Sequence, residues 1–507
     1  LYSKEPSSLM EELATVTAID NEKFTVVSQI KSSCNSCSQV STCASGQVAK
    51  AIPHKKLSFT LSKPKSLANQ CINVGDCVVL TLPKANVLQS AWQVYLLPVF
   101  GLLLFSAFGQ WLTLQGLLTH ELMALAVGDL QFKAIDERTG IYAEPVMLDK
   151  AHDEFIEVGE MVHTAEHLYG DYRWGRYDML VLPSGFPLGG MENPKLTFLT
   201  PTIISGDRSL VNLIAHELAH SWSGNLVTNA TWNDFWLNEG FTVYFEERIM
   251  ETIYDKEIAD MLSLIEYNEL LEETDGILKG NHPKDSHLKL SLEGRSPDEG
   301  MTAIAYVKGA FFLRTLEEKV GREKFDHFLK TYFEKHAFQT LTTEEFLEYL
   351  DINLLQKEQI SFNVDEWVYG TGIPENCIKL KSARYEKVDQ IVKDFTADYN
   401  VDKLDIKRKD WIFQEWNRFL SKLPKTTSPE TMAQLDEKYN FKNWGNSEIM
   451  QDWYVLAIQT GYKGSYPEMR NFLNTVGRGK FLEPIYHALM VSKDPTDNKL
   501  AHEIYQE

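Results

Sequence analysis

The feature that most constrains the fold of this chain is a long stretch without charge. No Asp, Glu, Lys or Arg occurs between Lys84 and Glu121, and the stretch is dominated by Leu, Val, Phe and Ala. A helix that crosses the hydrocarbon core of a bilayer needs about 20 apolar residues. Trp92 and Trp111 stand near its two ends, where interfacial aromatic side chains are favoured. The stretch therefore predicts one transmembrane helix at residues 90–120, with a buried helix of a soluble domain as the alternative.

The composition changes across this stretch. Residues 1–120 hold nine lysines, no arginine and six acidic residues, whereas the whole chain has 50 basic and 71 acidic residues and a net charge of −21. Five of the six cysteines lie in the first 80 residues. An acidic chain without clustered Lys and Arg does not suit nucleic acid. We therefore expect two unlike segments, and the positive-inside rule predicts that residues 1–89 face the cytoplasm.

Residues 1–89 predict a small β-rich domain, because alternating apolar runs are separated by Gly, Pro and Asn. A Ser-rich loop in this domain carries Cys34, Cys37 and Cys43. Three thiolates in one loop can converge on one centre, which suggests an iron–sulfur cluster, another soft metal or redox chemistry. Three reduced thiols without a ligand are the alternative.

Residues 10 to about 120 resemble the RseC/MucC family of bacterial inner-membrane regulators. The resemblance is carried by the start Met10–Val16, the cysteine loop, and the Ser90, Tyr95 and Pro98 positions at the membrane entry. It implies an inner-membrane location for the joined chain. That family has a second membrane helix, which we do not find in this sequence.

A metal-binding motif lies in the apolar-periodic run Ser209–Ser221, which predicts a helix. His216 and His220 are four residues apart, so both imidazoles lie on one helix face and can reach one ion. Glu217 can hold a metal-bound water and take its proton. Glu239 follows 19 residues after the second histidine, at the start of another helical run. Two imidazoles and one carboxylate leave a fourth position open, which indicates a single catalytic Zn²⁺.

A competing motif is His163-Thr-Ala-Glu166-His167, which fits the inverted zinc pattern His-x-x-Glu-His. It lacks a downstream acidic ligand in helical context. Its polar residues suit the solvated face of a helix, and we predict that role.

A glycine-rich segment precedes the metal motif and follows a strand-like run at Tyr177–Leu182. Paired glycines let the backbone approach a ligand closely, and a neighbouring carboxylate can bind an α-ammonium group. Taken alone, the segment predicts a tight turn in which the Glu side chain has no function. Beside a zinc site, it predicts that the segment binds the amino terminus of a peptide. Its residues are Gly189, Gly190, Met191, Glu192 and Asn193.

The stretch Tyr177–Phe245 resembles the gluzincin aminopeptidases of the leukotriene A4 hydrolase type, and the resemblance extends from Met123 to Glu507. It implies an α+β thermolysin-like zinc peptidase domain at residues 123–372 and an all-α helical-repeat domain at 380–507. It also implies a cytoplasmic location for this part and peptide substrates with a free amino terminus. Amphipathic runs at 410–423 and 448–459 agree with the helical domain.

The resemblance also implies a role for each matching residue. His216, His220 and Glu239 would bind zinc, Glu217 would be the general base, and Glu192 would bind the substrate amine. Tyr306 would donate to the oxyanion, a role that suits a neutral phenol beside the metal. Arg478 and Lys480 would hold the carboxylate end of a substrate, and Asp298 would line the same tunnel.

The sequence departs from that family in two places. The family's amino-terminal sheet domain is not part of the resemblance, and the cysteine-containing segment stands in its place. Met301 stands where epoxide-hydrolysing members have a second tyrosine, so the resemblance favours peptide hydrolysis over lipid epoxide hydrolysis. Two other functions stay open: a membrane-bound redox regulator of the RseC type, and a truncated, inactive peptidase fold that only binds.

Overall fold

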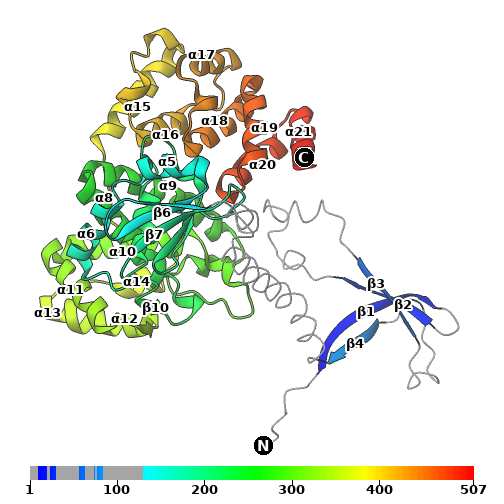
Figure 1. Cartoon of the computed structure of the whole chain (residues 1–507), viewed down its shortest axis with the longest axis horizontal. Helices are drawn as coiled ribbons and strands as arrows, with labels where there is room; N and C mark the ends of the chain where they lie inside the picture. Colours follow the sequence, from blue (N-terminus) through cyan, green and yellow to red (C-terminus); the bar gives the residue numbers. More distant parts are fainter. Residues whose placement is uncertain are drawn as a thin grey trace, which may run out of the picture. The chain divides into compact units, whose positions relative to one another are not determined.

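The structure is a computed structural model of the chain. It describes residues 9–19, 23–29, 56–62, 74, 77–83 and 130–506 (Figure 1). The chain divides into two compact units, Leu1–Asp129 and Leu130–Glu507. Each unit is described by itself.

The first unit contains a four-stranded antiparallel sheet in the order β3-β2-β1-β4. Its strands are β1 (Leu9–Ile19), β2 (Lys23–Gln29), β3 (Lys56–Ser62) and β4 (Cys77–Pro83). Val16 and Val26 are buried and occupy paired positions on β1 and β2. The described strands agree with the expected β-rich segment.

Two predictions for the first unit lie outside the described residues. They are the cysteine loop with Cys34, Cys37 and Cys43, and the transmembrane helix at 90–120. Within the part of the chain that the structure describes, no helix is long and apolar enough to cross a membrane.

The second unit begins with a five-stranded mixed sheet in the order β5-β6-β7-β9-β8. Strands β6, β7 and β9 are parallel, and β5 and β8 pair antiparallel at the two edges. Helices α5 and α6 connect β6 to β7. The bounds are β5 (Gln131–Ala134), β6 (Thr139–Ala143), α5 (Pro145–Glu154), α6 (Val158–Tyr169), β7 (Tyr177–Val181), β8 (Gly190–Met191) and β9 (Leu196–Leu199).

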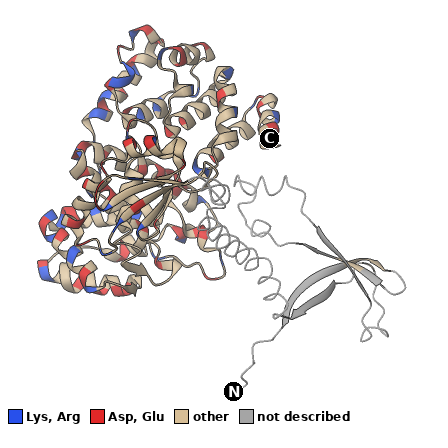
Figure 2. Cartoon of the chain, viewed as in Figure 1, with Lys and Arg blue, Asp and Glu red and all other residues tan. Residues whose placement is uncertain are grey.

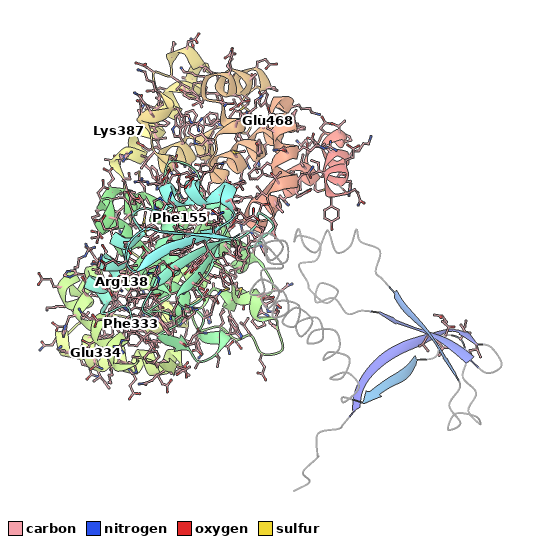
Figure 3. All side chains as sticks on the ribbon, viewed as in Figure 1. Arg138, Phe155, Phe333, Glu334, Lys387 and Glu468 are labelled. Atoms are coloured by element: carbon pink, nitrogen blue, oxygen red, sulfur yellow. The ribbon has the colours of Figure 1, made fainter. Side chains whose placement is uncertain are left out.

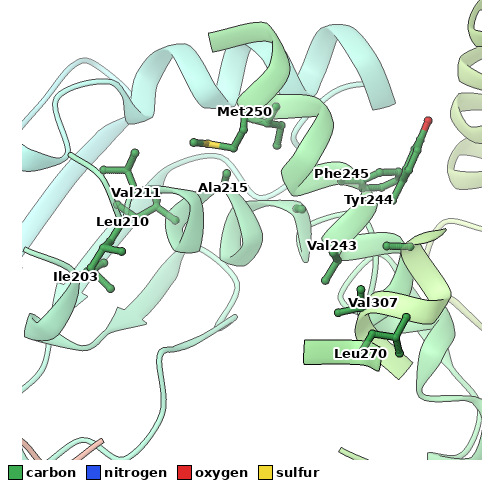
Figure 4. Packing of buried hydrophobic residues seen from close by; sticks show 14 of the residues in the cluster. Ile203, Leu210, Val211, Ala215, Val243, Tyr244, Phe245, Met250, Leu270 and Val307 are labelled. Atoms are coloured by element: carbon green, nitrogen blue, oxygen red, sulfur yellow. The ribbon is translucent and has the colours of Figure 1, made fainter. Parts of the chain in front are cut away.

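Helices follow the sheet, and α8 is the central one, because every residue from Trp236 to Met250 is buried. Figure 4 shows α8 side chains such as Val243 and Met250 in the hydrophobic cluster, with Ala215 of α7 opposite. The bounds are α7 (Asn212–Ala219), α8 (Trp236–Ile253), α9 (Lys256–Lys279), a π-helical turn η8 (Ile304–Lys308), α10 (Gly309–Val320), α11 (Arg322–Lys335), α12 (Thr343–Leu350), α13 (Gln356–Glu358) and α14 (Val364–Val368). A short parallel pair, β10 (Val227–Asn229) and β11 (Gln339–Leu341), lies within this region.

Among the described residues after 380, the regular elements are helices, as the amphipathic pattern predicts, and they stack from α15 to α21 in Figure 1. The two amphipathic runs correspond to α16 and α18. Charged residues of both signs are interspersed over these helices in Figure 2. The bounds are α15 (Ala383–Asp398), α16 (Phe413–Lys422), α17 (Pro429–Tyr439), α18 (Ser447–Thr460), α19 (Tyr466–Thr475), α20 (Gly479–Val491) and α21 (Pro495–Gln506).

Candidate active site

Three predicted metal ligands converge between α7 and α8. His216 lies on α7, His220 caps the carboxyl end of the same helix, and Glu239 lies in the first turn of α8. The Nε2 atoms of the two histidines are 3.2 Å apart. Oε2 of Glu239 lies 3.4 Å from Nε2 of His216 and 3.5 Å from Nε2 of His220. The helix periodicity and the packing of α7 on α8 therefore gather three ligand atoms at one point.

Neighbouring groups fix the tautomer of both histidines. Nδ1 of His216 lies 3.0 Å from a carboxylate oxygen of Glu246, and Nδ1 of His220 lies 3.1 Å from the backbone carbonyl of Ser223. A carboxylate or carbonyl oxygen only accepts, so each Nδ1 carries the proton. In the neutral form of both rings, the Nε2 atoms present lone pairs toward each other, which is the arrangement of two metal ligands.

The donor set fits a zinc ion. Oε2 of Glu239 is buried and has no hydrogen-bond partner among the described residues. Tetrahedral zinc with bonds of about 2.0–2.2 Å has ligand atoms about 3.3–3.6 Å from one another, close to the separations observed here. Although burial opposes it, the Glu239 and Glu246 carboxylates raise the pKa of His216 well above its usual range. The carboxylates of Glu239 and Glu246 thus favour a positive charge at the position where the three ligand atoms meet.

Glu217 lies on α7 against the edge strand β8. A Cβ atom on Gly190 would come within 2.2 Å of Oε1 of Glu217, so only glycine lets the strand lie this close. The sequence predicted a close approach of this segment to a ligand; here the approach is to the carboxylate of Glu217, the predicted general base. Burial, together with the charge of Glu192, raises the pKa of Glu217 to about 8.

Glu192 follows β8 and joins the same cluster. Its carboxylate and ligand atoms of Glu217 and His220 all lie within 4.8 Å of one another. Asn225 donates a hydrogen bond of 2.8 Å to the backbone carbonyl of Glu192, which fixes this end of the segment. The structure therefore places a second carboxylate beside Glu217, the predicted base, and His220, a predicted metal ligand.

Tyr306 lies on the π-helical turn η8. Its ring is 6.4 Å from the His216 ring and nearly parallel to it. Burial, followed by the charges of Glu239, Glu192 and Glu217, raises the pKa of Tyr306. The hydroxyl therefore keeps its proton and can donate it in a hydrogen bond.

The carboxyl-terminal helical region contributes Arg478. The backbone N–H of Gly477 donates to the carbonyl of Ser184 at 2.7 Å, which brings the segment beside the glycine-rich loop. A Cβ on Gly189 would lie 2.6 Å from Nη2 of Arg478. No carboxylate of the described residues lies within ion-pair distance of Arg478, and burial lowers its pKa. A guanidinium without an ion-pair partner among the described residues thus lies next to Gly189, 5.2 Å from the centroid of the Phe481 ring.

Two other predicted residues have different surroundings. Lys480 pairs with Glu448 at 2.9 Å. Asp298 lies on an exposed 3-10 turn (Pro297–Gly300) and accepts a hydrogen bond from Ser296. The structure does not join Asp298 to the carboxylates around His220. In the glycine-rich segment, the backbone N–H of Asn193 donates to the carbonyl of Met191, which forms a tight turn around Glu192.

The competing histidine motif has a structural role. Arg138, labelled in Figure 3, donates two hydrogen bonds of 3.0 and 2.8 Å to the carboxylate of Glu166. The His163 side chain is 72% exposed. The described residues contain no metal-ligand group at this motif. His163 and His167 are both exposed on α6, which agrees with the predicted solvated helix face.

The residues that hold the histidines were missed by sequence reasoning. Glu246 lies seven residues after Glu239 and thus on the same face of α8, a spacing that could have indicated it. Asn238, whose Oδ1 lies 2.9 Å from Nδ1 of His220, directly precedes a ligand and had no such signal.

The fold and this ligand set define a metallopeptidase site with two histidines from one helix and a glutamate from the next. Comparisons with known proteins agree. Residues 156–367 match the family model described as the peptidase family M1 domain, and residues 411–507 match the model "Leukotriene A4 hydrolase, C-terminal". The chain is thus similar to the peptidase family M1 domain over the first of these ranges and to the leukotriene A4 hydrolase carboxyl-terminal domain over the second. Residues 16–135 match the RseC/MucC model, so both predicted resemblances are confirmed.

Several relatives span the same part of the chain. Leucine aminopeptidase 2 of Yarrowia lipolytica is 36% identical over 76% of this chain and 62% of its own length. Aminopeptidase B of Mus musculus is 34% identical over 73% of this chain and 59% of its own length. The solved structure of yeast LTA4 hydrolase in complex with bestatin has a TM-score of 0.70 and 32% identity, covering 75% of this chain and 64% of that chain. The chain thus spans about three-fifths of the length of these relatives.

Proposed function

We propose that this chain is a zinc-dependent aminopeptidase that hydrolyses the first peptide bond of peptides with a free amino terminus. The observation that carries the proposal is the position of Glu192, whose carboxylate gathers with Glu217 and His220 within 4.8 Å. A carboxylate can bind an α-ammonium group by charge-assisted hydrogen bonds. Because this one lies directly beside the hydrolytic centre, only a terminal residue fits between the ammonium and the scissile carbonyl.

The chain's own residues supply the acid–base steps. His216, His220 and Glu239 would hold the zinc, which when bound polarises a carbonyl and makes water a nucleophile near neutral pH. Glu217 accepts the proton of the attacking water on a carboxylate oxygen and then delivers it to the leaving amine. A carboxyl with a raised pKa suits both transfers.

Tyr306 completes the centre as a hydrogen-bond donor to the oxyanion. Its hydroxyl stays protonated because burial and the carboxylates of Glu239, Glu192 and Glu217 raise its pKa. A neutral donor beside a developing negative charge stabilises the transition state more than the ground state.

Arg478 is proposed to hold the carboxylate end of a short peptide. The guanidinium lies behind Gly189 and has no carboxylate partner among the described residues, so it is available for a bidentate contact. Lys480 is proposed to hold the same carboxylate end, and in this structure its ammonium group pairs with Glu448. Met301 is 46% exposed and offers no hydroxyl, so lipid epoxide hydrolysis is not proposed.

The predictions for the amino-terminal segment are separate from the proposed peptidase function. Attachment to an inner membrane through residues 90–120 and a thiolate centre at Cys34, Cys37 and Cys43 remain predictions, and they agree with the RseC/MucC match. A regulator of that type is the second candidate function.

The test is zinc analysis of the full chain together with hydrolysis of one peptide in free and amino-terminally acetylated form. We expect one zinc per chain and cleavage of the free peptide only. Glu192→Gln should lower kcat/KM on the free peptide, whereas Glu160→Gln, an exposed residue of α6, should have no effect. Equal cleavage of both peptide forms would contradict the proposed amine site, and iron in place of zinc, lost on Cys34→Ser, would favour the regulator.

A further inference from the structure

We propose that Lys308 is a positioning residue that holds the hydroxyl of Tyr306 in place against Glu239. The inference rests on the proposed function and deepens it. Lys308 follows two residues after Tyr306 on the same π-helical turn, but it does not touch the reacting atoms. It acts by fixing the backbone that carries the tyrosine.

The π-helical turn needs such support. Helices with i→i+5 hydrogen bonds are rare, and single turns of this kind occur often at functional sites. Here the turn spans Ile304–Lys308 and is followed directly by α10. Because Tyr306 lies in its middle, any change of the turn to regular α-helix would rotate the hydroxyl away from the metal ligands.

Lys308 binds two backbone carbonyls from separate segments. Its side chain is completely buried. Its Nζ donates to the carbonyl of Ser286 at 2.6 Å and to the carbonyl of Gly370 at 3.2 Å. The two carbonyls belong to a 3-10 turn (Pro283–Ser286) and to the loop after α14. One ammonium group thus fastens the π-helical turn to two parts of the peptidase fold.

Among the described residues, the hydrogen-bond partners of the Lys308 ammonium group are these two carbonyls. No carboxylate of the described residues lies within ion-pair distance of its Nζ. The charged or titratable groups that act on it are Cys377 and His287. A buried ammonium without a counter-ion costs free energy unless its donors are satisfied, so its presence here indicates a specific role. Burial lowers the pKa of Lys308 to about 7.

The opposite side of the turn is held against the helix that carries Glu239. A Cβ on Gly309 would lie 2.8 Å from Cα of Gly240, and a Cβ on Gly240 would lie equally close to Cα of Gly309. The two backbones therefore touch next to a metal ligand. Val307 packs in the hydrophobic cluster near Val243 of α8 (Figure 4). The contact between Gly240 and Gly309 thus holds one side of the turn, and the two hydrogen bonds of Lys308 hold the other side.

The test is a double-mutant cycle in the full chain with Lys308→Met and Tyr306→Phe. If Lys308 acts through Tyr306, Lys308→Met should lower kcat about tenfold or more with KM little changed and zinc retained, and it should have less than a twofold effect in the Tyr306→Phe background. The control is Lys319→Met, an exposed lysine of α10. Independent effects that multiply in the double variant would overturn the proposal.

A second measurement does not depend on turnover and separates this inference from the proposed function. Hydrogen exchange of the segment 300–312 should be faster in Lys308→Met than in Lys319→Met, since the turn loses two anchors. Unchanged exchange would overturn the positioning role even in an active enzyme. Faster exchange in a chain without aminopeptidase activity would support the anchor and reject the function. Should Lys308→Met not fold, Lys308→Gln, whose side chain is uncharged and one atom shorter than lysine, is measured with the same expected and contradicting results.

Discussion

Gly190 and Glu217 lie so close that a single methyl group at Gly190 would come within 2.2 Å of Oε1 of the carboxylate. This contact determines the distance between the edge strand β8 and helix α7, which carries the predicted metal ligand His216. This contact couples the segment that carries Glu192 to the residue proposed as the general base.

The first prediction concerns this contact. Gly190→Ala should displace Glu217, because the new Cβ cannot occupy the space of its carboxylate. A displacement of about 1 Å can lower the rate about 100-fold. We expect kcat to fall by about this factor while zinc stays bound. Gly185→Ala, where a Cβ would meet no atom within 4 Å, is the control. Wild-type kcat in Gly190→Ala would show that the carboxylate has room to move.

Glu246 should determine the zinc affinity. It accepts from Nδ1 of His216 and, on its other oxygen, from Nδ2 of Asn212 at 2.8 Å. Removing such a partner of a metal-bound histidine typically weakens binding about 10- to 100-fold. Glu246→Ala should therefore lose zinc to a chelator at lower concentration than the wild type. An unchanged zinc dissociation constant would mean that the histidine is oriented by its packing alone.

Arg478 should affect only substrates with a carboxylate at the far end. A charge-assisted bond to a carboxylate contributes about 1.5–3 kcal/mol. Arg478→Gln should therefore raise KM roughly tenfold or more for a short peptide with a free carboxyl terminus and little for its amide. If both peptides respond equally, the guanidinium supports the fold rather than the substrate.

Lys308 gives a prediction about stability and pH. Its pKa in the folded chain is lowered to about 7, whereas an unfolded lysine titrates near 10.5. Between these values the unfolded state binds more protons, so this residue makes stability rise with pH. Well below pH 7 the lysine is protonated in both the folded and the unfolded state, so its contribution to the free energy of unfolding does not change with pH. Chemical denaturation should show that the wild type gains stability relative to Lys308→Met as the pH increases from 7 to 10. A constant difference would contradict a buried, titrating ammonium.

Much of the active site could be predicted from the sequence, because helix periodicity fixes which residues share a face. The spacing of His216 and His220, together with the second helical run that begins near Glu239, is enough to indicate the ligand set. The strand before Gly189 and the helices after residue 380 were also predictable from their patterns.

The remainder depends on tertiary packing that no local pattern encodes. The role of Gly190 is a close approach to a side chain 27 positions later, and Arg478 reaches the site through a loop contact with Ser184. Lys308 looks like an ordinary charged helix residue in the sequence, yet its side chain is completely buried. The resemblance implied that Asp298 lines the same tunnel as Arg478, and this stays a prediction; the structure shows the residue on an exposed turn.

The central claim is that Glu217 is the base of a zinc hydrolase, and the most direct measurement compares zinc content and turnover of the wild type and Glu217→Gln. The amide is nearly the same shape as the carboxyl but cannot accept the proton of the attacking water. We predict one zinc per chain in both proteins and a loss of turnover of at least about 100-fold in the variant. Turnover equal to that of the wild type, with zinc retained, would contradict the account.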